Sequence, residues 1–164
     1  MAKAQVISVD NFIRDISKLG YDFKALAGPA LYEGAGILAD ELRAKIQALP
    51  ERDGKVFIKD GQMGKGVTPK QKQALLDNMG IARMRYTDGT YQIKIGFEGY
   101  IDPPTKSYPR GTPVSMIARA VESGTSFLQK TPFIKPAYNS AKEKAEKAMT
   151  KSLEDTWSKY GGGK

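Results

Sequence analysis

The stretch that decides the fold is Met116-Ile117-Ala118-Arg119-Ala120-Val121-Glu122-Ser123-Gly124-Thr125-Ser126-Phe127-Leu128-Gln129-Lys130-Thr131-Pro132-Phe133-Ile134-Lys135-Pro136-Ala137. It predicts a short helix that ends at Glu122 or Ser123, because Gly124 can take the left-handed conformation that favours a helix end. An extended connector follows, since the residue before Pro132 avoids the helical region. The stretch contains no reactive group, so it points to shape rather than to chemistry.

A long helix is predicted from Pro136 to about Tyr160, because a proline in the first turn of a helix loses no hydrogen bond. Small side chains recur along one stripe of this helix, and larger apolar ones lie beside them; the small ones are Ala137, Ala141, Ala145, Ala148 and Ser152, and the larger ones Met149, Leu153, Trp157 and Tyr160. The last four residues, 161–164, read as a flexible tail.

Two helices are predicted at the N-terminal end of the chain. The first begins at Ser8 or Asp10 and ends at Gly20. After a break near Gly28-Pro29, apolar residues recur at helical spacing over residues 30–48 and predict an amphipathic helix. This helix contains Gly34 and Gly36, which we expect to mark the close approach of another backbone.

The middle of the chain predicts a hairpin. Residues 50–66 read as a glycine-rich loop with a strand candidate at Val56–Ile58, and residues 69–78 as a short helix. Apolar and polar residues then alternate on both sides of the turn pair Asp88-Gly89, which is typical of a β-hairpin with one buried face. We expect the side chains of Ile81, Ile93 and Ile95 to face the core.

The predicted fold class is therefore α+β, with a small antiparallel sheet whose central hairpin is packed by an N-terminal helix pair and a long C-terminal helix. A chain of 164 residues fits one domain, so residues 1–160 are expected to form a single domain.

Composition argues against enzymatic chemistry. The chain contains no cysteine and no histidine, so it lacks thiolate ligands, the commonest general base and the commonest metal ligand. The segment Gly61–Gly66 does not have the spacing of a phosphate-binding loop. We therefore expect no catalytic residue, no cofactor, no metal and, since no apolar run approaches a membrane span, no membrane contact.

The formal net charge is +8, which indicates either a nucleic-acid partner or a solvated surface. Basic and aromatic residues alternate in the hairpin, at Arg83, Arg85, Tyr86, Tyr91, Lys94 and Phe97. We favour the interpretation that these basic side chains face water. On the last helix, Lys144, Lys147 and Lys151 form a polar stripe, and we expect them and Lys142 mostly to face solvent or acidic neighbours.

The C-terminal half of the chain resembles the tail-component proteins of long-tailed bacteriophages and prophages. That family typically carries an Ala-Arg-x-x-Glu-x-Gly-Thr-Ser run, then Pro-Phe, then Pro-Ala at the start of the last helix. The matching residues here are Ala118, Arg119, Glu122, Gly124, Thr125, Ser126, Pro132, Phe133, Pro136 and Ala137. A second block, Gly80–Met84 and Lys94–Tyr100, also fits, whereas Thr68–Leu76 departs from the Thr-Gly-x-Leu segment of many members.

The resemblance implies a tail-completion or head–tail joining protein. Such proteins form homo-oligomeric rings between the tail tube and the head connector, and their partners are other virion proteins. The implied location is the virion, and the host cytoplasm during assembly, with DNA contact at most incidental. The motif residues would then set local shape or contact a neighbouring subunit.

Two details of the motif, and the function itself, stay open at this stage. Arg119 and Glu122 have the spacing of an ion pair within one helix. Phe133 would hold the connector onto its own core or insert into a neighbouring protomer. The alternative function is a basic nucleic-acid-binding module, and a small hydrolase with an unfamiliar site is a weaker third.

Overall fold

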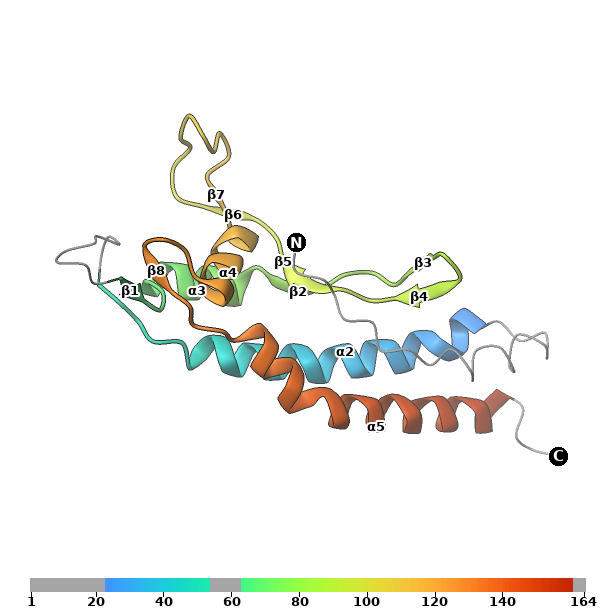
Figure 1. Cartoon of the computed structure of the whole chain (residues 1–164). Coiled ribbons are helices and arrows are strands. Elements are labelled where there is room, and N and C mark those ends of the chain that lie inside the picture. The colour runs from blue at the N-terminus through green and yellow to red at the C-terminus, as the bar shows by residue number, and fades with distance from the viewer. Residues whose placement is uncertain (1–22, 54–62, 161–164) are drawn as a thin grey trace. The chain divides into compact units, whose positions relative to one another are not determined.

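The computed structural model describes residues 23–53 and 63–160 (Figure 1). The elements run in the order α2 (Phe23–Gln47), β1 (Gly64–Lys65), α3 (Pro69–Asp77), β2 (Met79–Ile81), β3 (Arg85–Thr87), β4 (Thr90–Gln92), β5 (Ile95–Phe97), β6 (Tyr100–Ile101), β7 (Thr112–Pro113), α4 (Val114–Ser123), β8 (Leu128–Gln129) and α5 (Ile134–Tyr160). The predicted α+β class is confirmed. The predicted first helix, the strand candidate Val56–Ile58 and the four-residue tail lie outside the described residues.

These residues form two compact units. One unit contains the described residues up to 38, residues 81–94 and the chain from 141 onward. The other contains residues 39–80, of which 54–62 are not described, and residues 95–140. We refer to them as the hairpin unit and the connector unit. That residues 1–160 behave as a single domain stays a prediction.

The connector unit holds the larger apolar core. Its largest fully buried side chains come from several different elements and the segments between them; they are Ile46, Val67, Leu75, Val114, Val121 and Phe133. The rings of Phe97 and Phe133 meet edge-on, with centroids 6.2 Å apart. Burial of each large apolar side chain contributes about 1.5–3 kcal/mol to the stability of the fold. This core therefore holds the elements around the connector in place.

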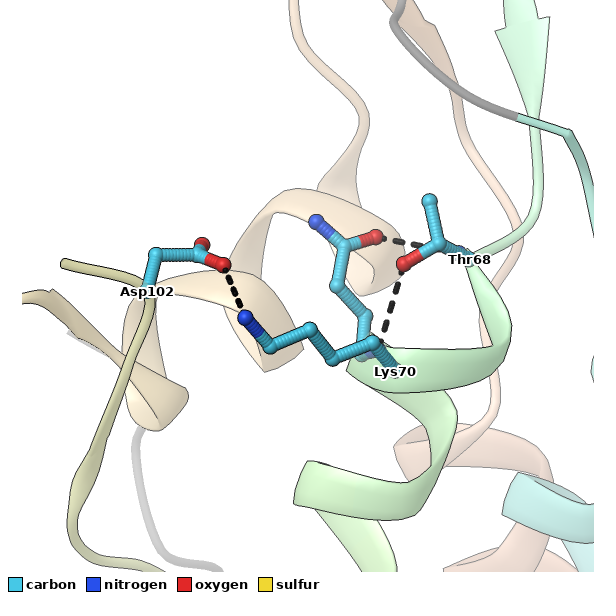
Figure 2. Close-up of polar contacts among 4 residues, drawn as sticks. Thr68, Lys70 and Asp102 are labelled. Atoms are coloured by element: carbon cyan, nitrogen blue, oxygen red, sulfur yellow. Dashed lines mark hydrogen bonds and ion pairs between the residues drawn. The ribbon is translucent and has the colours of Figure 1, made fainter.

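Helix α3 starts at a complete capping box (Figure 2). The Thr68 hydroxyl accepts from the Gln71 N–H at 3.2 Å, and the Gln71 side chain accepts from the Thr68 N–H at 3.1 Å. Pro69 occupies the first turn, where its missing N–H costs nothing. In the same first turn, the Lys70 ammonium donates to the Asp102 carboxylate at 2.9 Å and so ties the end of β6 to α3. The helix predicted over residues 69–78 is confirmed.

The strands do not form one antiparallel sheet. The described strands make four two-stranded pairs, β1–β8, β2–β5, β3–β4 and β6–β7. The β1–β8 pair is parallel, with Gly64 opposite Leu128 and Lys65 opposite Gln129. The expectation that Gly64 and Lys65 belong to a loop is therefore wrong, because the connector offers backbone partners that the local sequence does not reveal.

In the hairpin unit, the first part of α2 packs on the second part of α5. Ala30, Met149 and Leu153 form a small buried cluster with Leu31 at its edge. A side chain at Gly34 would overlap the Met149 side chain, whereas the nearest backbone atom, the Ala145 carbonyl oxygen, would lie 3.7 Å away. The close neighbour at this glycine is therefore a side chain and not the expected backbone. The same expectation is wrong at Gly36, where a Cβ would meet no atom within 4 Å.

The predicted break near Gly28-Pro29 is also wrong, because α2 continues through Pro29. A proline inside a helix costs about 3 kcal/mol through its lost hydrogen bond and its clash with the preceding turn. Burial of Leu26, Ala27 and Ala30 on either side offsets this cost. Packing at this position therefore overrides local propensity.

The β3–β4 ribbon pairs Arg85 with Gln92, Tyr86 with Tyr91 and Thr87 with Thr90. Asp88 and Gly89 both have positive φ, at 52° and 78°, as a two-residue hairpin turn requires. The hairpin is confirmed, but its predicted buried face is not. Ile81 is exposed, Ile93 and Ile95 are only half-buried, and all of β3 is exposed.

Candidate functional site at the connector between α4 and α5

Helix α4 divides sharply into a buried and an exposed face. Val114, Ile117, Ala118 and Val121 are buried, whereas Ser115, Met116, Arg119 and Ser123 are exposed. The helix ends at Ser123, as predicted. Arg119 forms no ion pair with any described residue, so the predicted pairing with Glu122 does not form.

Glu122 instead binds the beginning of α5. One carboxylate oxygen accepts from the N–H groups of Phe133 and Ile134, at 2.7 and 2.8 Å. The other oxygen accepts from the N–H of Lys135 at 3.1 Å. A carboxylate suits this position because the N-terminus of a helix carries partial positive charge and unpaired N–H groups.

This contact accounts for every donor in the first turn of α5. Glu122 takes the first three N–H groups, and the fourth position is Pro136, which has none. The first regular helical bond then runs from the Ala137 N–H to the Phe133 carbonyl at 3.1 Å. The prediction that α5 opens at Pro136 is therefore wrong by two residues, because Glu122 stabilises a start at Ile134.

Gly124 begins the connector with φ 76° and ψ 169°. The positive φ is as predicted, but the residue is not left-handed helical, since its ψ is extended. This region of backbone space is essentially restricted to glycine. A Cβ at Gly124 would also lie 3.0 Å from the Lys130 nitrogen and 3.1 Å from the Leu128 carbonyl oxygen, so the returning chain fills the space that a side chain needs.

Thr125 folds the connector back on itself. Its hydroxyl accepts from the N–H groups of Phe127 and Leu128 at 3.2 and 3.1 Å, and its own N–H donates to the Leu128 carbonyl at 2.9 Å. Ser126, at the tip of the turn, is exposed. The Thr131 N–H then donates to the Val121 carbonyl at 2.9 Å, which returns the chain to the end of α4.

Phe127 is the residue that the sequence analysis missed. Its side chain is 56% exposed, although its N–H is held by Thr125 and its carbonyl accepts from the Gly64 N–H at 3.1 Å. A large apolar side chain within a polar turn is unusual and could have been noticed in the sequence. It was overlooked because Phe133, six residues later, is the more obvious candidate for the core.

Phe133 is the anchor of the connector. It is 1% exposed and packs edge-on against Phe97 within the same unit. Its insertion into a neighbouring protomer is therefore not needed to bury it. Pro132 and Pro136 on either side are exposed. Of the predicted motif residues, Glu122, Gly124, Thr125 and Phe133 shape the connector, while Arg119 and Ser126 are left on its surface.

Other polar features of the described residues lie apart from the connector motif. No group of three or more acidic residues there is placed to hold a metal ion. Burial lowers the pKa of the Arg52 guanidinium, which donates to Gln71 at 3.3 Å and serves to tie chain segments together. A cleft of about 430 Å³ in the hairpin unit is lined by acids and lysines alike, including Glu33, Asp155 and Lys151.

No helix among the described residues is long and apolar enough to cross a membrane. Comparisons with protein-family models, with curated proteins and with solved structures find no match to this chain. The functional interpretation therefore depends on the connector itself and on the resemblance that its residues carry.

Proposed function

We propose that this chain is a structural protein of a tailed phage or prophage particle, which forms a ring at the head–tail interface or the tail terminus during assembly. Its partners would be other copies of itself, the tail tube and the head connector. The observation that supports the proposal is the connector: the resembling residues between Ala118 and Ala137 lie on α4, the connector and the start of α5, where Glu122, Thr125 and Phe133 hold the backbone in place.

The connector has the properties of a docking element. Glu122, Thr125 and Phe133 fix its backbone through hydrogen bonds and burial, so little conformational entropy remains to be lost on binding. Phe127 stays more than half exposed on this fixed backbone. Pre-placed aromatic and arginine side chains are the residue types that dominate binding energy at protein interfaces, and Arg119 is exposed on the adjoining helix.

A catalytic role has no comparable support. Among the exposed motif residues, Arg119 forms no ion pair and the Ser126 hydroxyl forms no hydrogen bond with a described residue. A site for covalent chemistry needs a nucleophile within hydrogen-bond reach of a base. The motif residues instead hold the connector backbone in place or lie exposed for contact with a partner protein.

The test is deletion of the gene in the phage or prophage that carries it, followed by electron microscopy of the lysate. We expect heads and tails that fail to join, or tails of uncontrolled length, and recovery when the intact chain is supplied in trans. The double variant Arg119→Ala/Phe127→Ala should fold and fail to complement, whereas the control Glu143→Ala, on an exposed position of α5, should complement. Normal tailed particles from the deletion strain would overturn the proposal.

A further inference from the structure

The hairpin formed by residues 81–94 is a second surface, separate in function from the connector. It contains three cations, Arg83, Arg85 and Lys94, and one acid, Asp88. All four side chains are exposed. None of the three cations forms an ion pair with a described residue, so the hairpin has a local positive charge that the described parts of the chain leave uncompensated.

Several other lysines and arginines among the described residues are paired with acids. Lys70 binds Asp102 and Lys72 binds Glu51, both at 2.9 Å, and Arg43 binds Asp40 at 3.0 Å. On α5, Lys142 lies 3.9 Å from Glu146, and acidic residues alternate with the lysines that follow. The hairpin is therefore a described surface whose cations are not paired with acids, as is the loop that holds Lys106 and Arg110.

Aromatic side chains lie on the same hairpin. Tyr86 and Tyr91 are opposite each other across the strands, with ring centroids 4.8 Å apart and planes at 50°. Tyr86 is 64% exposed, the largest exposed fraction among the large apolar side chains described. Its ring is supported from one side by Tyr91 and open to solvent over most of its surface, which is the arrangement of a stacking platform.

The base of the hairpin is held in place. The Met84 N–H donates to the Tyr32 hydroxyl of α2 at 3.1 Å, and the Met84 side chain approaches Gly28 of the same helix. The cations and the tyrosine pair are thus presented on an anchored ribbon. A two-stranded antiparallel ribbon also has the width that the DNA major groove admits.

We propose that the hairpin of residues 81–94 binds the phosphodiester backbone of nucleic acid. Uncompensated cations beside an open tyrosine fit a ligand that offers both regularly spaced phosphates and flat bases. An acidic protein surface would satisfy the cations but gives no reason for the exposed ring. This inference is independent of the ring proposal, and it replaces the expectation that DNA contact is only incidental.

The experiment measures binding of the full chain to a fluorescent 30-nucleotide single strand and to its duplex, by anisotropy from 50 to 200 mM salt. The variant Arg83→Gln/Arg85→Gln/Lys94→Gln removes three charges from the hairpin. Its matched control, Lys144→Gln/Lys147→Gln/Lys151→Gln, removes three from α5. We expect the hairpin variant to lower the slope of log affinity against log salt by about 2 to 3, since each phosphate contact contributes about 0.7–0.9. The α5 control should retain affinity within about twofold of the parent, because its lysines lie among acids.

Further variants distinguish the two kinds of nucleic acid and guard against misfolding. Tyr86→Ala should weaken single-strand binding roughly tenfold and change duplex binding little if bases stack on the ring. Equal losses on both would instead place the ring against the sugar–phosphate backbone that the two ligands share. Arg85→Gln alone repeats the charge test if the triple variant loses its parental circular dichroism spectrum. Three results would each overturn the proposal. The first is an equal loss of affinity in the hairpin and α5 variants, and the second is no binding at 100 mM salt. The third is competition by polyglutamate as strong as that by DNA at equal charge.

Discussion

Replacing Glu122 by alanine removes the acceptor for three N–H groups at the start of α5. A hydrogen bond to a charged group contributes about 1.5–3 kcal/mol net. The donors of Phe133 and Ile134 are partly shielded and would be left unpaired, whereas the exposed Lys135 can bond to water. Because one carboxylate makes all three hydrogen bonds, their contributions to the free energy of unfolding do not add fully. We expect Glu122→Ala to lower the free energy of unfolding by about 2–4 kcal/mol, above the roughly 0.5–2 kcal/mol of an ordinary N-cap replacement.

Glu122→Gln is the matched variant that separates charge from shape. Its amide oxygen can keep the bonds to Phe133 and Ile134, and only the Lys135 bond and the negative charge are lost. The charge contributes about 0.3–1 kcal/mol at a helix N-terminus, so we expect a loss near 1 kcal/mol. Arg119→Ala should change stability by less than about 0.5 kcal/mol, as for an exposed side chain without a partner.

Two measurements check these values. Urea unfolding followed by circular dichroism gives the stability differences, provided that the denaturant slope is unchanged. Amide hydrogen exchange should show faster exchange at Phe133 and Ile134 in Glu122→Ala. A Glu122→Ala protein within about 0.5 kcal/mol of the parent, or an Arg119→Ala protein as unstable as Glu122→Ala, would refute the assigned role of this carboxylate.

Two further stability predictions concern the connector. Gly124→Val should lower the free energy of unfolding by about 1–3 kcal/mol in chemical denaturation, because the backbone there is essentially restricted to glycine. Ser126→Ala at the exposed tip should lower it by less than about 0.5 kcal/mol. Equal denaturation midpoints for the two variants would show that the backbone assignment is wrong. Phe133→Ala should lower the free energy of unfolding by about 3–5 kcal/mol, because it removes a core side chain. Phe127→Ala should leave stability within about 0.5 kcal/mol of the parent. A reversal of that order in thermal melts would contradict the placement of the two rings.

The features that local rules control were predictable from the sequence. The end of α4 at Ser123, the helix after Thr68 and the turn at Asp88-Gly89 each depend on the backbone preferences of a few adjacent residues. The burial of Phe133 in its own core was one of the two alternatives that its position between prolines left open. In each of these places local propensity and tertiary packing favour the same structure.

The features that the sequence did not reveal depend on contacts between distant residues. Three positions separate Arg119 from Glu122, which suggests a pair, but the carboxylate binds N–H groups 11 to 13 residues away. The strand at Gly64–Lys65 exists because β8 pairs with it, and α2 passes through Pro29 because its flanking residues are buried. The periodicity of the sequence does not identify contacts between residues so far apart in the chain. Phe127 is recognised as an exposed side chain only when the structure shows that Phe133 fills the core.

The central claim is that the chain acts as a fixed part of an assembled particle, and labelling purified particles tests it most directly. An antibody against the chain, visualised with gold by electron microscopy, should mark the head–tail interface or the tail terminus. Quantitative mass spectrometry of the same particles should give a constant ratio of this chain to the head connector protein. Absence of the chain from purified particles, while it accumulates in the cytoplasm of the producing cells, would contradict the proposal.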